Sequence, residues 1–145
     1  MAYSGRYNLK NKGKYKGDPN NIIWRSTWEL KFLKYLDNHP NILEFSSEEH
    51  VVPYISPLDG KYHRYFVDFY LKVLTKEKEI KEYLVEIKPY VQTLEPKRPK
   101  KITESYVNTV KTYLINSAKW NAAKKYAEKQ GMSFIVITEN HLFLK

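Results

Sequence analysis

The chain has 145 residues and no cysteine, and its 25 lysines and arginines against 16 aspartates and glutamates give a formal net charge of +9. This length suits one domain, and the absence of cysteine excludes disulfide frameworks, thiolate zinc sites and cysteine nucleophiles. No apolar run approaches the roughly 18 residues of a membrane span. We therefore expect a soluble, intracellular protein with no membrane partner.

The basic charge is accompanied by a 15% content of aromatic residues. A basic surface with interleaved aromatic side chains is typical of a protein that binds nucleic acid. A solubilising surface, or contact with an acidic protein, explains the same composition.

Residues 1–21 form a polar and basic stretch that buries little apolar surface by itself. We expect a basic N-terminal arm, either mobile or laid along a partner, followed by a single domain over residues 22–145.

A helix is predicted from Ser26 to about Asn38, because Ser26 and Glu29 have the spacing of a capping box and His39-Pro40 ends the pattern. Its predicted inward stripe consists of Trp28, Phe32, Tyr35 and Leu36. Glu29 falls on or beside this apolar face. A carboxylate there needs a cation, a metal ion or a proton.

Strands are predicted at residues 50–56, 64–74 and 82–88, the first of them at a sheet edge because Pro53 cannot donate a hydrogen bond. A basic loop with three prolines follows, then helical segments at 103–114 and 117–130, a glycine cap at Gly131 and a buried strand at 133–138. This order predicts a mixed α/β fold with a central β-sheet flanked by helices.

Asp68 and Glu86 are predicted to face each other across a hairpin. If residues 75–79 form its loop, Leu74 pairs with Ile80 and Asp68 comes opposite Glu86. Two ionised carboxylates at that separation need a cation or a raised pKa, and Mg²⁺ fits the gap. Lys88 projects from the same face, and Glu29 could reach the same place from its helix.

Spacing alone leaves a second interpretation open, in which these groups belong to a solvated sheet face with cross-strand ion pairs. The Glu-x-Lys triplet occurs four times in the chain, at residues 29, 79, 86 and 95. Among these, the triplet at Glu86 lies on a predicted strand and has an aspartate on the neighbouring strand.

Asp68 followed by Glu86-Ile87-Lys88, with Glu29 on a preceding helix, resembles the PD-(D/E)XK nuclease superfamily. Longer segments resemble, within it, the head completion nucleases of T-even-type tailed bacteriophages, and the superfamily also includes a transposase endonuclease subunit. These segments are residues 1–5, 15–19, 25–29, 52–54, 64–68, 86–89, 120–123 and 131–139. One departure is Val67, where the superfamily name expects proline. That residue should face the core.

The resemblance implies a restriction-endonuclease-like fold and a Mg²⁺-dependent DNA endonuclease, with Mn²⁺ able to substitute. It implies metal ligation by Glu29, Asp68 and Glu86 and a catalytic role for Lys88. The resemblance also implies that the protein is located in the virion, and in the host cytoplasm during assembly. There it acts on packaged double-stranded DNA before tail attachment, in contact with phage portal or head proteins.

Other basic side chains are candidates for contact with DNA phosphates. They are Arg25, Arg64, Lys97, Arg98, Lys100 and Lys101. A surface ion pair for the first two, and a plain exposed loop for the other four, remain alternatives. Two further functions also remain open: a non-catalytic virion protein that binds the DNA end or the portal, and a junction-resolving or repair nuclease of the same superfamily.

Overall fold

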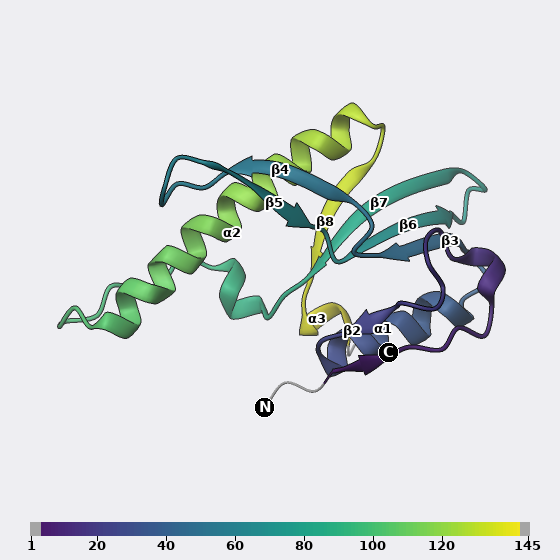
Figure 1. Ribbon diagram of the computed structural model, residues 1–145, viewed down its shortest axis with the longest axis horizontal. Coiled ribbons are helices and arrows are strands. Elements are labelled where there is room, and N and C mark those ends of the chain that lie inside the picture. Colours follow the sequence, from purple (N-terminus) through teal and green to yellow (C-terminus); the bar gives the residue numbers. More distant parts are fainter. Residues whose placement is uncertain (1–3, 143–145) are drawn as a thin grey trace.

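The centre of the molecule is a four-stranded sheet with the strand order β3-β6-β7-β8 (Figure 1). The computed structural model describes residues 4–142. The strands of this sheet are β3 (Ile42–Ser47), β6 (Phe69–Leu74), β7 (Ile80–Ile87) and β8 (Ser133–Ile137). Neighbours are antiparallel except β7 and β8, which are parallel because the long helix α2 (Glu104–Lys129) connects them. This architecture confirms the predicted α/β class with a mixed sheet.

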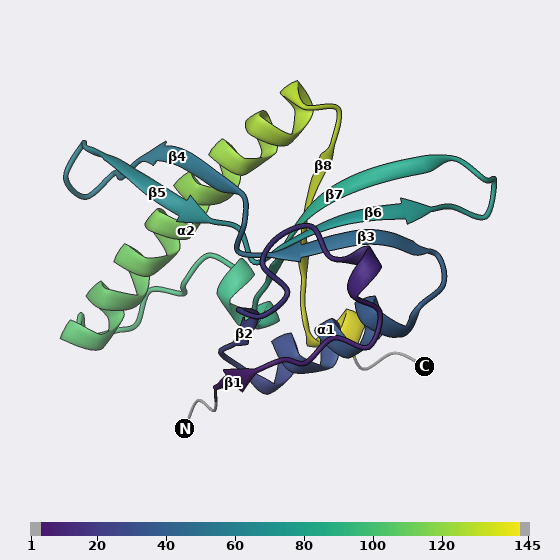
Figure 2. The same ribbon diagram turned by 45° about the vertical axis from the view of Figure 1, so that its right-hand side comes forward.

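Two layers cover the sheet (Figures 1 and 2). On one side lie α1 (Thr27–Asn38), the short α3 (Glu139–Leu142), the ribbon of β1 (Gly5–Arg6) and β2 (Ile23–Trp24), and the 3-10 turn η1 (Lys12–Lys14). On the other side lie α2 and the hairpin of β4 (Val51–Ile55) and β5 (Tyr62–Phe66). A second 3-10 turn, η2 (Tyr90–Thr93), follows β7. Each layer has its own apolar core.

Helix α1 begins and ends where the sequence predicts. The Ser26 side chain accepts a hydrogen bond from the Glu29 N–H at 3.1 Å, and the His39 N–H closes the last turn on the Tyr35 carbonyl. Phe32 and Leu36 are buried as expected. The expectation for Tyr35 is wrong, because its side chain is 50% exposed and the buried position beside Leu36 is taken by Asp37.

The N-terminal segment differs from the mobile or partner-bound arm that its composition suggests. Residues 4–21 pack on the body of the domain, with Tyr7 and Tyr15 buried in the same core as α1. Asp37 anchors the segment, since its carboxylate accepts hydrogen bonds from the Tyr7 hydroxyl at 2.7 Å and from the Lys10 N–H at 2.9 Å. Two tyrosines and one buried carboxylate thus hold a basic stretch in which Leu9 also packs against the core and Lys14 Nζ donates to backbone carbonyls at the end of α1. Residues 1–3 lie outside the described part.

The predicted strand 64–74 is two strands, β5 and β6, interrupted at Val67 and Asp68. Opposite this break the chain bends between β3, which the sequence analysis missed, and β4. The bend has three residues, 48–50, whereas the break opposite it has two, Val67 and Asp68. Glu48 absorbs the mismatch in the left-handed conformation, with φ 57°. The break reverses the alternation, so Val67 is buried against the α2 layer whereas Phe69 is buried against α1.

The remaining elements refine the sequence predictions. Leu74 pairs with Ile80, which confirms the hairpin register. The two predicted helical segments are one continuous helix, α2, with Gly131 following it at φ 75°. Strand β8 is not buried as predicted, because it lies at the sheet edge and Ile135 is 37% exposed. Within residues 4–142 there is no helix long and apolar enough to cross a membrane.

Candidate active site

Asp68 and Glu86 come together at the end of the central hairpin. The paired residues of β6 and β7 extend to Phe69 and Val85, and Asp68 and Glu86 occupy the next position. Asp68 Oδ2 accepts a hydrogen bond from the Ile87 N–H at 2.8 Å, so the Asp68 carboxylate closes the end of β7. Glu86 is buried, with 5% of its surface exposed.

The two carboxyl groups act strongly on each other. Burial and the neighbouring Glu86 carboxylate together raise the pKa of Asp68 well above its usual range, more than the Ile87 N–H lowers it. Two like charges so placed retain a proton or bind a cation. The pair is therefore a natural place for a hard divalent ion.

Lys88 forms an ion pair with one member of this pair, Glu86. Its Nζ lies 3.5 Å from Glu86 Oε1, and its backbone N–H donates to the Ile137 carbonyl at 3.0 Å, which joins the end of β7 to β8. The other oxygen, Glu86 Oε2, is buried without a hydrogen-bond partner. The two oxygens of Glu86 thus have different surroundings, one charged and one unsatisfied.

Glu29 approaches the pair from α1. Burial raises the pKa of Glu29, and the charges of Glu48 and Glu86 raise it further, whereas the Arg25 N–H, which donates to Glu29 Oε2 at 3.2 Å, lowers it. Glu29 in turn contributes to the raised pKa of Asp68. The helix-borne acid predicted from the sequence therefore lies within electrostatic reach of both others.

Glu48 is an acidic residue of this region that the sequence analysis did not identify. It forms an ion pair with Arg25, and its backbone N–H donates to the Asp68 carbonyl at 3.0 Å. Glu48, Glu29 and Asp68 all raise the pKa of Arg25. Without strand β3 in the prediction there was no sequence signal to place Glu48 beside the break at Asp68.

The acids do not form a closed metal cage. Among residues 4–142 there is no group of three or more His, Cys, Asp or Glu side chains arranged to hold one ion. The side chains of Glu29, Asp68 and Glu86 are therefore not arranged to bind one ion together as direct ligands. Mg²⁺ is usually held by one or two carboxylates together with water and substrate phosphates, and the Asp68–Glu86 pair meets that requirement.

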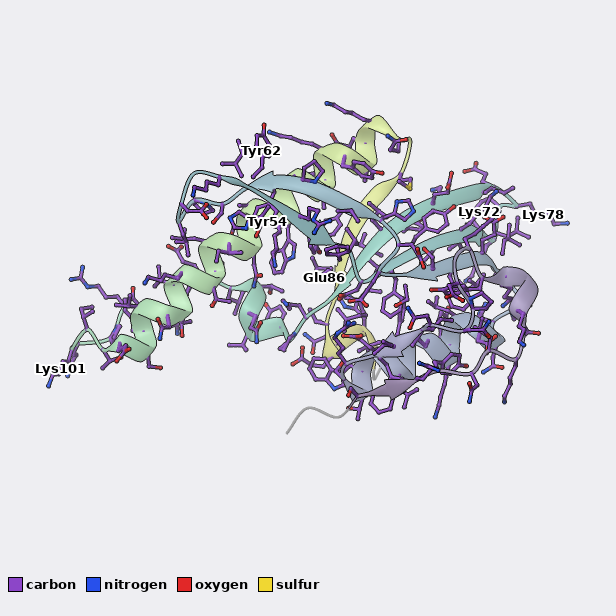
Figure 3. The ribbon with its side chains drawn as sticks, viewed as in Figure 1. Tyr54, Tyr62, Lys72, Lys78, Glu86 and Lys101 are labelled. Carbon is purple, nitrogen blue, oxygen red and sulfur yellow. The ribbon has the colours of Figure 1, made fainter. Side chains whose placement is uncertain are left out.

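The predicted DNA-contacting residues lie in separate places. Arg25 is held at the acids by Glu48, and Arg64 is exposed on β5 with its guanidinium 5.7 Å from the centre of the Phe66 ring. The other four are exposed in the loop before α2: Lys97, Arg98, Lys100 and Lys101. Lys101 lies at one end of the molecule and Glu86 near its centre (Figure 3). The structure does not bring this loop to the acids.

Two histidines in and beside the β4–β5 hairpin have partners of their own. His63 pairs with Asp59 at 2.8 Å near the tip of the hairpin, and the His50 ring packs beside Tyr70. Burial lowers the pKa of His50, which favours its neutral form.

Comparison with known proteins identifies the family of the chain. The family described as TnsA-like endonuclease N terminal matches residues 39–139, a range that contains Asp68, Glu86 and Lys88. The head completion nuclease of Enterobacteria phage T4 is 40% identical over 146 residues, covering 98% of this chain and 95% of that protein. No solved structure matches significantly. The chain belongs to the family of this head completion nuclease and of the TnsA-like endonucleases, and it is an endonuclease with a PD-(D/E)XK-like fold.

Proposed function

We propose that this endonuclease cleaves double-stranded DNA with the help of Mg²⁺, which Mn²⁺ can replace, held at Asp68 and Glu86. The observation that carries the proposal is the contact between two carboxyl groups that keeps the pKa of Asp68 high. Carboxylate oxygens are the ligands that Mg²⁺ prefers. When bound, the ion would neutralise charge on the phosphodiester.

The chain's own residues then take separate roles. Asp68 and Glu86 hold the ion, with the Ile87 N–H fixing the Asp68 carboxylate at 2.8 Å. Glu29 acts as the third acid by holding water beside the pair. The Lys88 ammonium group lies 3.5 Å from Glu86 Oε1. It turns to the scissile phosphate and stabilises the negative charge that builds there during cleavage.

Arg25 and the basic loop supply contact with the DNA backbone. Arg25 neutralises Glu48 beside the acids and is partly exposed, so it can turn to a phosphate near the cleavage point. The loop residues Lys97, Arg98, Lys100 and Lys101 lie farther out and would hold DNA that extends along α2. Arg64 on β5 adds a third contact. Phosphate contacts of this kind bind DNA without reading its sequence.

We infer from the phage relative that the enzyme works in head completion. The relative is named a head completion nuclease, and the two chains match over nearly their whole lengths. The corresponding role here is action on packaged DNA before tail attachment, within the virion or the host cytoplasm, in contact with portal or head proteins.

Cleavage of supercoiled plasmid DNA by the purified chain tests this function. We expect nicking or linearisation in Mg²⁺ or Mn²⁺, none after chelation, and none with Asp68→Ala or Lys88→Ala. Asp59→Ala on the β4–β5 hairpin and Lys81→Ala at the far end of β7 are matched controls, because they remove the same residue types away from the pair. Equal cleavage by all four variants would exclude the assigned site.

A further inference from the structure

Three polar side-chain atoms on the α2 side of the active site are buried without a partner. Among the side chains of residues 4–142, the unsatisfied buried atoms are Tyr65 Oη, Glu86 Oε2 and Trp120 Nε1. Buried polar atoms are nearly always hydrogen-bonded, because leaving one unpaired retains the full cost of removing it from water. Three such atoms in one small region need a common explanation.

Tyr65 interacts with both of the other groups. Tyr65 on β5 is 4% exposed, and its hydroxyl pKa is raised by burial, then by the charges of Glu86 and Asp68. The Trp120 indole acts on the same hydroxyl in the opposite direction. Tyr65 therefore lies between a carboxylate on β7 and an indole on α2, in the core that the β4–β5 hairpin shares with the sheet and α2.

Their chemistry is complementary in one order. An indole N–H only donates, an ionised carboxylate only accepts, and a phenol hydroxyl does both. We infer that the Trp120 indole donates to Tyr65 Oη and that the Tyr65 hydroxyl donates to Glu86 Oε2. A small rotation of these side chains completes the chain and satisfies all three atoms.

This chain makes Tyr65 a positioning residue for Glu86. With Oε2 held by Tyr65, Oε1 remains on the side of Lys88, which lies 3.5 Å away. The carboxylate plane is then fixed before the ion arrives. The consequence for cleavage rests on the proposed function, because it matters only if Glu86 holds the metal ion. Groups that orient metal ligands in this way commonly change metal affinity by about 10–100-fold.

Tyr54 provides a matched control. It lies on β4 beside Tyr65, and Lys119 Nζ is 5.9 Å from the centre of the Tyr54 ring and 5.5 Å from that of Tyr65. Tyr54 is also buried, with 7% exposed. Asp59, and not Glu86, is the charge that raises its pKa besides burial. Tyr54→Phe removes the same hydroxyl from the same core without touching the chain to Glu86.

Calorimetric titration of the full chain with Mn²⁺ gives the first test. We expect Tyr65→Phe to raise the Kd for Mn²⁺ by about 10-fold, Trp120→Phe to raise it less, and Tyr54→Phe to leave it unchanged. Wild-type affinity in Tyr65→Phe would overturn the inference. If the wild-type chain itself does not bind Mn²⁺, the proposed function fails and the second test alone decides the inference.

The second test needs no metal ion. Urea unfolding in chelator of Tyr65→Phe, Glu86→Gln and the double variant forms a double-mutant cycle. We expect the unfolding constant of the double variant to depart from the product of the single effects by roughly threefold or more. The same cycle with Tyr54→Phe should be multiplicative. A multiplicative cycle for Tyr65→Phe would overturn the hydrogen-bonded chain, whatever the metal data show.

Discussion

Replacing Asp68 with asparagine should abolish cleavage and yet stabilise the metal-free protein. The change removes one of two like charges held in contact by the end of the hairpin. It keeps the hydrogen bond from the Ile87 N–H, because the amide oxygen accepts it as the carboxylate Oδ2 does at 2.8 Å. The new amide N–H₂ can also donate to the neighbouring Glu86 carboxylate.

The expected gain follows from the charge pair. Two unit charges about 4 Å apart repel by about 4 kcal/mol at an effective dielectric constant of about 20. The protein avoids most of this by retaining a proton, as the raised pKa of Asp68 indicates. The remaining cost suggests that Asp68→Asn raises the unfolding free energy by about 1–3 kcal/mol. For a chain of this length that is roughly 3–10 °C in Tm.

The gain should depend on pH in a definite direction. A carboxyl whose pKa is raised by folding stabilises the protein fully below its unfolded pKa of about 3.9, and this contribution is lost as pH rises through the folded pKa. The asparagine variant has no such group. Its advantage over the wild type should therefore be near zero at about pH 4 and grow as pH rises.

Urea unfolding of both proteins in chelator, at several pH values, measures the effect. Saturating Mg²⁺ should reverse the order, because an ion that binds only the folded wild type adds about 2.7 kcal/mol at 100 times its Kd. A variant that is less stable than the wild type at neutral pH in chelator would refute the reasoning. So would an advantage that does not change with pH.

Further predictions concern the N-terminal segment, the basic loop and Arg25. Asp37→Ala should lower the unfolding free energy by about 3–5 kcal/mol, because the Tyr7 hydroxyl and the Lys10 N–H lose their acceptor; urea unfolding checks this, and a loss below about 1 kcal/mol would contradict it. Neutralising the loop cations together should weaken DNA binding and flatten the slope of log K against log salt by up to about 3–4; an unaltered slope would place the DNA elsewhere. These cations are Lys97, Arg98, Lys100 and Lys101. Arg25→Gln should tighten Mn²⁺ binding by calorimetry, since the arginine competes for the acids, and should weaken DNA binding; looser Mn²⁺ binding would show that Arg25 instead supports the site.

The central hairpin shows how far local pattern reaches. Five loop residues and the alternation of side chains are enough to pair Leu74 with Ile80, and the same register carries Asp68 to Glu86. The cap at Ser26 likewise places Glu29 at the start of α1. These features depend on neighbours a few residues apart or directly across a hairpin, so their signals are readable in the sequence.

The prediction was least complete where distant segments meet. A one-residue mismatch between the bend at Glu48 and the break at Asp68 reversed the faces of a strand that looked continuous. The N-terminal segment reads as a solvated arm by composition, yet Tyr7 and Tyr15 find a core supplied by α1 and β3. Average polarity does not reveal two buried side chains in a basic stretch.

The chain's amino acids alone determined the α/β class, the start of α1, the hairpin register and the proximity of Asp68 to Glu86, because short-range geometry encodes them. Only the tertiary structure decided that Glu48 and Arg25 join the acids, that the basic loop stands apart, and that Tyr65 lies between Glu86 and Trp120. Those relations arise from packing between segments far apart along the chain. These contacts form only once the chain has folded, so no local sequence pattern predicts them.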